Sequence, residues 1–211
     1  RHRGLCTGGR VLEGHARMRP RFPTWRGEDK AGEALVVRVA DRRDAAQFIA
    51  HTRQLVTETD FMLKGGTDAL PGIPEQRLIL DYFASAPNSL CIVAARPSRP
   101  LGRAPILGSL TLTPGRTGRT QHTVQLGMGV LRTAWGLGLG GRLLDGALTW
   151  ARANPILSRV SLQVYEDNEA ARQLYLTRGF VDEGVMVDEV RLEGRWMALV
   201  GMSYDTTRGE T

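Results

Sequence analysis

Four glycines stand close together in the stretch AWGLGLGGRLLDGALTWAR, residues 134–152: Gly136, Gly138, Gly140 and Gly141. An amphipathic, leucine-rich pattern follows them. Glycine is a poor helix former, so such a cluster needs a reason beyond helix propensity. The first turn of a helix offers unpaired N–H groups and a partial positive charge, and glycine lets an anion approach them closely. The cluster therefore predicts a site where main-chain amides hold a phosphate or pyrophosphate group.

Three alternatives compete with this interpretation. Gly136, Gly138 and Gly141 satisfy the dinucleotide-binding string G-x-G-x-x-G, with Glu166 at the end of the following strand, so an NAD-binding oxidoreductase stays open. In that motif the glycines follow their strand almost directly, whereas five residues intervene here. A P-loop needs Lys followed by Ser or Thr, and Arg142 followed by leucine stands there instead. Tight packing of the helix on a sheet would also favour small residues.

Periodicity and turn signals divide the chain into strands and helices. Strands are expected at 34–40, 89–96, 105–113, 122–130 and 159–166, with two more within 180–204, and helices at 41–59, 73–87, 139–153 and 167–178. This order, β-α-α-β-β-β-α-β-α-β-β, predicts an α/β (α+β) fold. We expect a mixed central β-sheet of about seven strands with helices on both faces.

Short polar residues and glycines mark several boundaries. Asp41 can cap the first helix, and Asp167 or Asn168 can cap the last one. Gly179 follows the last helix, where a left-handed residue closes it. A turn at Glu193 and the glycine after it joins the two final strands.

Two stretches together resemble the GNAT N-acetyltransferase superfamily. VQLGMGVLRTAWGLGLGGRLLDGALTWA resembles its acetyl-CoA motif, Q/R-x-x-G-x-G/A between a strand and a helix, and LQVYEDNEAARQLYLTRGF resembles the strand and helix that follow. The resemblance covers roughly residues 35–205. Trp135 departs from the pattern, because it occupies the first motif position, where Gln or Arg is usual. Binding through the main chain is unaffected by that change.

The resemblance implies acetyl-CoA as cosubstrate, bound without a metal. The pyrophosphate would lie on the amides around the glycines, and the pantetheine along the main chain of Met128 and Val130. The implied cofactor-binding residues are Met128, Gly129, Val130, Trp135, Gly136, Leu137, Gly138, Leu139, Gly140, Gly141, Asn168 and Tyr175. Gly127 and Gly129 would let their strand bulge away from the next one. Capping the helix would by itself explain Asn168.

The resemblance also implies catalytic roles. The main-chain N–H of Met128 would stabilise the developing oxyanion, and Tyr175 would be the general acid, although its helical position also fits a core tyrosine. Gln125 stands where many relatives carry a glutamate base, and an amide cannot accept that proton. Glu58 and Asp60 lie in the implied substrate-binding region, where they would hold a cationic amine or act as base, although solvated carboxylates would look the same.

Composition limits the remaining classes of function. The 211 residues, 42% of them hydrophobic, suffice for one substantial core, and no apolar run reaches the ~20 residues that span a bilayer. We therefore expect no membrane partner. Cys6 and Cys91 are far apart and have no metal-ligand spacing, which favours a cytoplasmic protein. The histidines His51 and His122 have no identifiable partner, so they receive no role.

The net charge of +6 is unevenly distributed. Residues 1–33 hold eight Lys or Arg and four Asp or Glu, and Gly and Pro interrupt them, so we expect a basic, irregular N-terminal arm. Since its basic residues do not recur on one helical face, we expect no nucleic-acid partner. We divide the chain into this arm, a GNAT acetyltransferase domain at 34–205 and a C-terminal tail at 206–211.

The predicted function is an acetyl-CoA-dependent N-acetyltransferase that moves an acetyl group directly to a primary amine of a small molecule or protein. The acceptor is not identified by the sequence, and a homodimer is compatible with the resemblance. The alternatives are a non-catalytic GNAT-like domain that binds acyl-CoA and, further off, the NAD-binding oxidoreductase.

Overall fold

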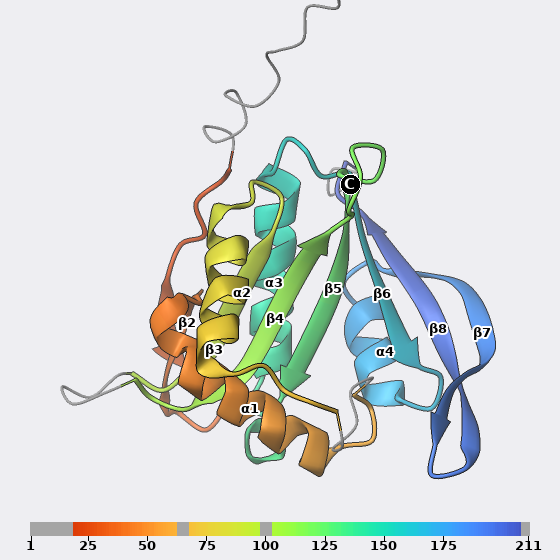
Figure 1. The fold of residues 1–211 in the computed structure, drawn as a ribbon, viewed down its shortest axis with the longest axis horizontal. Helices are drawn as coiled ribbons and strands as arrows, with labels where there is room; N and C mark the ends of the chain where they lie inside the picture. Colours follow the sequence, from red (N-terminus) through yellow and green to blue (C-terminus); the bar gives the residue numbers. More distant parts are fainter. Residues whose placement is uncertain (1–18, 63–67, 98–102, 208–211) are drawn as a thin grey trace, which may run out of the picture.

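A mixed β-sheet with helices on both faces positions everything else in the computed structural model, which describes residues 19–62, 68–97 and 103–207 (Figure 1). Its strands are β1 (Trp25–Glu28), β2 (Ala34–Val39), β3 (Leu90–Ala95), β4 (Ile106–Pro114), β5 (Thr123–Val130), β6 (Arg159–Tyr165), β7 (Val181–Leu192) and β8 (Arg195–Asp205). Its α-helices are α1 (Ala45–Glu58), α2 (Ile73–Ser85), α3 (Leu139–Ala153) and α4 (Glu169–Leu176). The predicted α/β class is confirmed, and so is the predicted order of the strands and α-helices from β2 onward.

The eight strands of the sheet lie in the order β1-β2-β3-β4-β5-β6-β8-β7. Neighbouring strands are antiparallel except β5 and β6, which are parallel. A doubly wound dinucleotide-binding fold needs a mostly parallel sheet. The sheet is therefore not that of the NAD-binding alternative.

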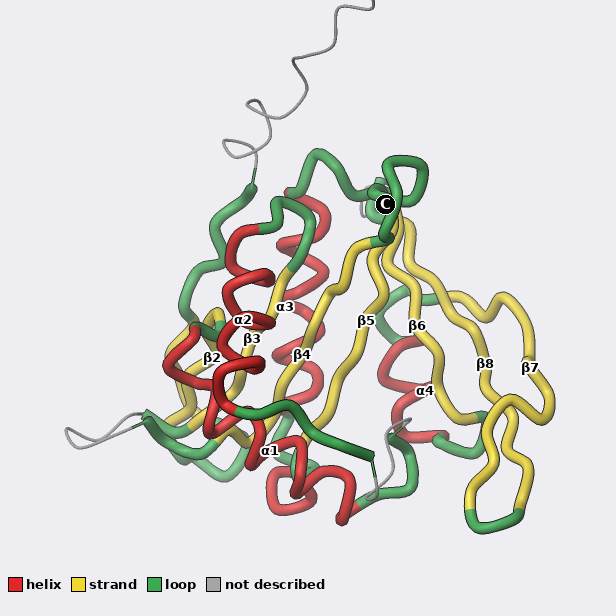
Figure 2. Tube along the Cα trace, viewed as in Figure 1, coloured by secondary structure: helices red, strands yellow, loops and turns green. Residues whose placement is uncertain are grey.

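The helices form two layers, with α1 and α2 on one face of the sheet and α3 and α4 on the other (Figure 2). The larger core lies between the sheet and α3, whose apolar stripe is buried as its spacing predicts. The stripe consists of Leu139, Leu143, Ala147, Leu148 and Ala151. A smaller core packs α1 and α2 against β3, around Leu80, Phe83 and Val93.

An ion pair fixes the start of α1 against the sheet. The carboxylate of Asp44 is fully buried and accepts two hydrogen bonds of 2.7 Å from the guanidinium of Arg38, on β2. Asp41 caps the 3-10 turn that leads into α1, because its side chain accepts from the N–H of Arg43 at 2.7 Å. Charged and capping groups therefore set where α1 begins.

Part of the N-terminal arm is ordered, contrary to the irregular structure expected for residues 1–33. Residues 25–28 form β1, an antiparallel edge strand on β2, which is why the sheet has eight strands and not about seven. Phe22 packs against α3 at Gly146, and the indole of Trp150 donates to the carbonyl of Pro20 at 2.8 Å. These contacts depend on tertiary packing. The sequence did not predict β1, because the strand is short and its apolar and polar residues do not alternate. Residues 1–18 lie outside the described part.

The expected C-terminal tail begins with an anchored residue. Thr206 is buried, and its N–H and hydroxyl donate to the carbonyls of Ser158 and Leu157 at 3.1 and 2.9 Å. Residues 208–211 lie outside the described part. Among the described residues, no helix is both long and apolar enough to cross a membrane.

Candidate functional site

The two parallel strands at the centre of the sheet separate along their length. Pairing between β5 and β6 covers only Thr123–Gln125 and Arg159–Ser161, although β5 continues to Val130. The ladder between β4 and β5 runs to the same end without a register shift. The expected gap between β5 and the next strand is present, but it does not come from a bulge at Gly127 and Gly129, because β5 stays paired with β4 while β6 diverges from it.

The register of the β4–β5 ladder shows where the main chain of Met128 points. Gly115 N–H donates to Thr123 O, and Leu131 N–H donates to Leu107 O, so hydrogen-bonded pairs fall on the odd-numbered residues of β5. The N–H and C=O of Met128 therefore point away from β4. They face β6 at a level where the two strands are no longer paired.

The glycine cluster forms the loop before α3. Gly136 and Gly138 have φ angles of +74° and +84°, a left-handed conformation that favours glycine. Gly138 is the N-cap of α3, and no side chain caps the helix. Since Leu139, Gly140 and Gly141 open α3, their amides have no acceptor within the helix. The backbone thus presents three N–H donors at the positive end of the helix.

Packing explains the other two glycines in part. A Cβ on Gly141 would stand 2.5 Å from a guanidinium nitrogen of Arg178, and one on Gly140 would touch Leu174 of α4 at 3.4 Å. Gly146, further along the same helix, makes room for Phe22, with ring atoms 3.1 and 3.2 Å from where its Cβ would stand. Small residues here therefore serve helix packing as well as an open helix end.

The ordered part of the arm brings a cation to this helix end. Lys30 donates its main-chain N–H to the carbonyl of Leu137 at 3.2 Å, and its aliphatic chain lies against Gly138. The guanidinium of Arg142 stacks on the ring of Trp25, 4.3 Å from its centroid. No acidic residue occupies the first turn of α3. Cations at the positive end of a helix repel its dipole, so this arrangement favours an anionic ligand between them.

Trp135 makes a hydrogen bond to the main chain of Val130, which the resemblance assigned to the cofactor. Its indole N–H donates to the carbonyl of Val130 at 2.8 Å, and the guanidinium of Arg132 lies over its ring. The carbonyl of Val130 is therefore engaged within the protein. The N–H of Val130, an even-numbered residue of β5, still points toward β6.

Tyr175 and Asn168 both have structural roles in α4. Tyr175 is buried with its ring 5.5 Å from that of Phe180, and burial raises the pKa of its phenol to about 12. Asn168 is the N-cap of α4, and its Oδ1 accepts from the N–H of Ala171 at 3.2 Å. Gly179, with φ of +85°, closes the helix as predicted. A phenol with this pKa stays protonated at neutral pH and remains a hydrogen-bond donor.

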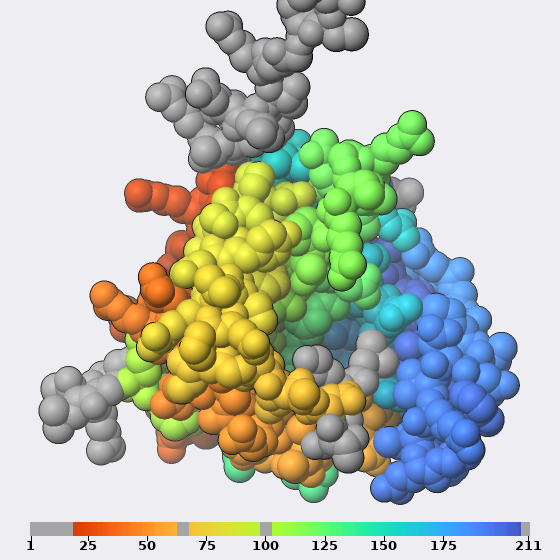
Figure 3. Space-filling model, viewed as in Figure 1, coloured from red at the N-terminus to blue at the C-terminus, as the bar shows by residue number. Residues whose placement is uncertain are grey.

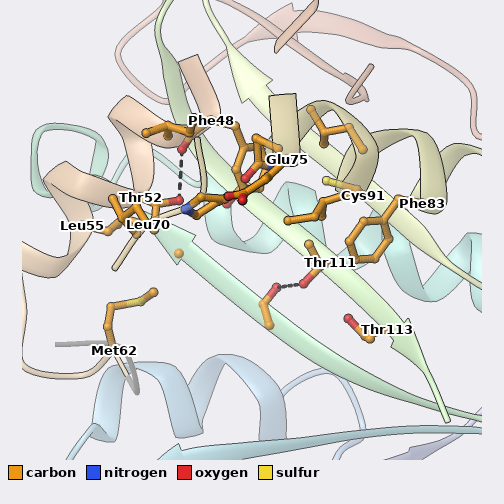
Figure 4. A pocket seen from close by; sticks show the side chains of 18 of the residues that line it. Phe48, Thr52, Leu55, Met62, Leu70, Glu75, Phe83, Cys91, Thr111 and Thr113 are labelled. Carbon is orange, nitrogen blue, oxygen red and sulfur yellow. Dashed lines mark hydrogen bonds between the residues drawn. The ribbon is translucent and has the colours of Figure 1, made fainter. Parts of the chain in front are cut away.

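A cavity of about 740 Å³ lies on the face of the sheet that carries α1 and α2. Figure 3 shows this face hollowed between the yellow atoms of α2 and the blue atoms of the C-terminal strands. Most of the lining side chains are apolar, among them Phe48, Leu70 and Phe83 (Figure 4). Met128 is among the residues that line the same cavity, so the cavity reaches the place where β5 and β6 part.

Hydroxyl groups line the floor of this cavity. Ser109, Thr111 and Thr113 alternate along β4, and Figure 4 shows the hydrogen bond of 3.4 Å from Thr111 Oγ1 to the carbonyl of Gly127. Ser109 Oγ lies 3.1 Å from Nε2 of His51, on α1. The sequence gave His51 no partner, because Ser109 lies 58 positions further along the chain. The one sequence signal for His51 was its helical spacing, because it lies one turn before Leu55, which is also buried in α1.

Of the two carboxylates expected near the acceptor, Glu58 is tied to the protein. Its Oε2 accepts from the N–H of Arg132 at 2.7 Å, and its Oε1 accepts from Gln54 at 2.7 Å. The hydrogen bond from Arg132 holds the pKa of Glu58 below its usual value, which makes it a weak base. Glu58 instead joins the end of α1 to the loop before α3.

Asp60 is exposed beyond the end of α1, within electrostatic reach of Tyr165. Burial raises the pKa of Tyr165, and the charges of Asp167 and Asp60 add to that effect. Gln125, where a base was sought, accepts a hydrogen bond of 3.1 Å from Ser161 Oγ. Across the described ranges, no three His, Cys, Asp or Glu side chains are grouped as metal ligands.

Comparisons with known proteins agree with this architecture. The sequence model of the acetyltransferase (GNAT) family matches residues 60–180. A GNAT-family acetyltransferase from Streptococcus pneumoniae is 30% identical, with a TM-score of 0.74 over 81% of this chain and 98% of its own. A putative acetyltransferase from Salmonella typhimurium, solved with acetyl-CoA, is 18% identical, with a TM-score of 0.69 over 84% and 96%. The spermidine N-acetyltransferase from Vibrio cholerae, solved with CoA and spermine, is 18% identical, with a TM-score of 0.63 over 82% and 96%.

The buried imidazole predicts that stability depends on pH. Burial lowers the pKa of His51 to about 4 from 6.5, so on acidification the unfolded chain takes up a proton that the folded chain refuses. As the pH falls from about 6.5 to about 4, the free energy of unfolding should therefore fall by up to about 3 kcal/mol from this residue. Urea unfolding at several pH values measures it.

Replacing His51 by Leu should flatten that part of the pH dependence, because leucine takes up no proton. The matched control is His122→Gln, which also removes one histidine but at an exposed position. Equal slopes for wild type and His51→Leu would contradict the burial effect.

Proposed function

The chain belongs to the GNAT acetyltransferase family, and from that premise we propose that it transfers an acetyl group from acetyl-CoA directly to a primary amine. The acceptor is the amine of a small molecule or of a protein. The observation that carries the proposal is the separation of β5 and β6, with a helix end on one side of the sheet and a cavity on the other. The uncapped amides of α3 lie on one face of the sheet, and the cavity lies on the other. We propose a cytoplasmic setting, as the low cysteine content favours.

The residues at the start of α3 fit the phosphates of acetyl-CoA. Three first-turn amides would bind the pyrophosphate, and the left-handed glycines at 136 and 138 add no side chains of their own at the helix end. Lys30 and Arg142 would add positive charge on the outer side. Two similar structures, the Salmonella protein and a phosphinothricin acetyltransferase from Sinorhizobium meliloti, were solved with acetyl-CoA, which supports this cosubstrate.

Acetyl-CoA supplies an activated acetyl thioester. In the transfer an N–C bond forms and the C–S bond breaks, while the amine loses a proton and the leaving sulfur gains one. We assign stabilisation of the carbonyl oxygen to the N–H of Met128, which points into the β5–β6 separation. We assign the proton for the sulfur to the Tyr175 phenol. We assign the proton of the amine to Asp60 or to a water molecule, because Gln125 is an amide and Glu58 is engaged.

Acetyl-CoA titration combined with thiol release tests this function. Calorimetry should give binding of acetyl-CoA but not of NAD, and a thiol-reactive dye should detect free CoA when a primary amine is added. Binding of acetyl-CoA without turnover across a broad panel of amines would favour the non-catalytic alternative. Absence of acetyl-CoA binding would contradict both the acetyltransferase function and the non-catalytic alternative.

Replacing Lys30 by Ala should weaken acetyl-CoA binding by about three- to ten-fold, because a cation beside the helix end is lost. The effect should shrink as salt is added, since the side chain is exposed and its charge is screened. Arg26→Ala is the matched control, because it removes one exposed positive charge from β1. Equal losses for both variants would show that only net charge matters.

Tyr175→Phe should lower kcat by about 100-fold and leave acetyl-CoA binding nearly unchanged, because only the proton donor is lost. The matched control is Tyr204→Phe, since the rings of Tyr204 and Tyr175 both lie 5.5 Å from that of Phe180. The control should retain wild-type turnover. Full turnover in Tyr175→Phe would remove the assignment of the acid.

A further inference from the structure

Ser109 and His51 form a hydrogen-bonded pair at the sheltered end of the cavity. Ser109 Oγ lies 3.1 Å from His51 Nε2, and Ser109 lines the cavity. His51 lies behind it on α1, only 2% exposed. Leu55, one turn further along α1, covers Gly129, which is the strand partner of Ser109. Helix α1 therefore closes this end of the cavity, and the hydroxyl of Ser109 lies inside the cavity.

The hydroxyl of Ser109 keeps a free lone pair whichever tautomer His51 adopts. A neutral imidazole has one N–H and one acceptor nitrogen, and a serine hydroxyl has one O–H and two lone pairs. If Nε2 carries the hydrogen, it uses one of these lone pairs. If Nε2 accepts, both lone pairs remain. In either case Ser109, which lines the cavity, keeps one acceptor lone pair.

An attacking amine needs such an acceptor. Its nitrogen lone pair must point at the carbonyl carbon, so its N–H bonds need partners elsewhere. Ser109 pairs with Gly129 across the ladder, about 5.5 Å between Cα atoms for such a pair, and Met128 is the next residue. Ser109 and Met128 therefore line the same cavity from neighbouring strands.

The walls of the cavity indicate what the amine is attached to. Phe48, Leu70, Ile79 and Phe83 are among the apolar side chains around it. Glu75 is the acidic residue among the lining residues described, and one of its oxygens accepts from the N–H of Gly72 at 3.0 Å. Transfer of an apolar group from water to such walls lowers the free energy, whereas a second ammonium group would lose its hydration there at a cost.

We propose that the cavity takes a primary amine carried on an apolar body, and that Ser109, held by His51, accepts a hydrogen bond from its nitrogen beside Met128. This inference rests on the proposed acetyltransferase function and names the class of its acceptor. Ser109 contacts the substrate, whereas His51 is a positioning residue that acts through Ser109. The ring of His51 meets that of Phe48 edge-on, with the ring centroids 6.3 Å apart. The low pKa of His51 agrees with a neutral ring.

The first test compares substrates and Ser109 variants, with 2-phenylethylamine as the probe and spermidine as the charged comparison. The wild type should show a higher kcat/KM for 2-phenylethylamine. Ser109→Ala should lower that kcat/KM about tenfold or more and leave acetyl-CoA affinity unchanged. Ser109→Thr keeps the hydroxyl and should retain most of the activity. Ser203→Ala is the matched control, since Ser203 is a buried strand serine that donates to Glu183 at 2.8 Å.

The second test separates positioning from a merely structural role. His51→Leu should lower kcat/KM about as much as Ser109→Ala does, and His51→Gln, which restores a polar group at this point, should recover part of it. In the Ser109→Ala background, His51→Leu should cost nothing further, because its effect passes through the hydroxyl. The pH profile of kcat/KM should keep its shape in all variants, since none removes a group that titrates between pH 5 and 9.

The outcomes distinguish this inference from the proposed function. Turnover of amines with an unchanged kcat/KM in Ser109→Ala would overturn the role of Ser109 and leave the acetyltransferase function standing. A preference for spermidine would overturn the apolar body. Additive losses in the double variant, or loss of an acidic limb in His51→Leu, would overturn the positioning role. Absence of turnover with every amine, despite acetyl-CoA binding, would contradict the function itself.

Discussion

The separation of two parallel strands is the constraint on which this site depends. A buried main-chain N–H or C=O without a partner is costly, so a β-strand normally continues its pairing as far as its neighbour allows. Here β5 keeps its full ladder with β4 while β6 leaves it after Gln125. The main-chain groups of Met128 are therefore directed at an opening in the sheet. Such an opening is stable because a ligand or water can complete the missing hydrogen bonds.

This opening divides the work of the site between the two faces of the sheet. On one face α3 presents uncapped amides, and the arm adds Lys30 beside Gly138. On the other face α1 and α2 enclose a largely apolar cavity with a hydroxyl-lined floor. A helix end without a side-chain cap and a largely apolar cavity thus lie on opposite faces of the sheet, and the β5–β6 separation lies between them.

Several elements hold this arrangement by contacts that no single helix or strand contains. Glu58 binds the main chain of Arg132 and so ties α1 to the loop before α3. Arg38 and the buried Asp44 fix the other end of α1 against β2. Phe22 fills the space over Gly146, and Trp150 bonds to Pro20. In the region that the structure describes, the N-terminal arm is therefore part of the support of α3.

The amino-acid sequence by itself determined the order of the elements, the buried stripe of α3 and the local signals at Asp41, Asn168 and Gly179. These follow from periodicity, capping and turn chemistry, whose causes lie within a few residues along the chain. It also placed the glycine loop correctly, because left-handed φ angles at 136 and 138 require a residue without a Cβ.

Only the tertiary structure decided which side chains meet. It paired His51 with Ser109 and Trp135 with the carbonyl of Val130, and it added Trp25–Glu28 to the sheet as an eighth strand. It also showed that Glu58 is engaged. The physical reason is that hydrogen bonds and packing between distant segments depend on how layers of the fold are placed in space. A single sequence carries no periodic or local signal of that placement.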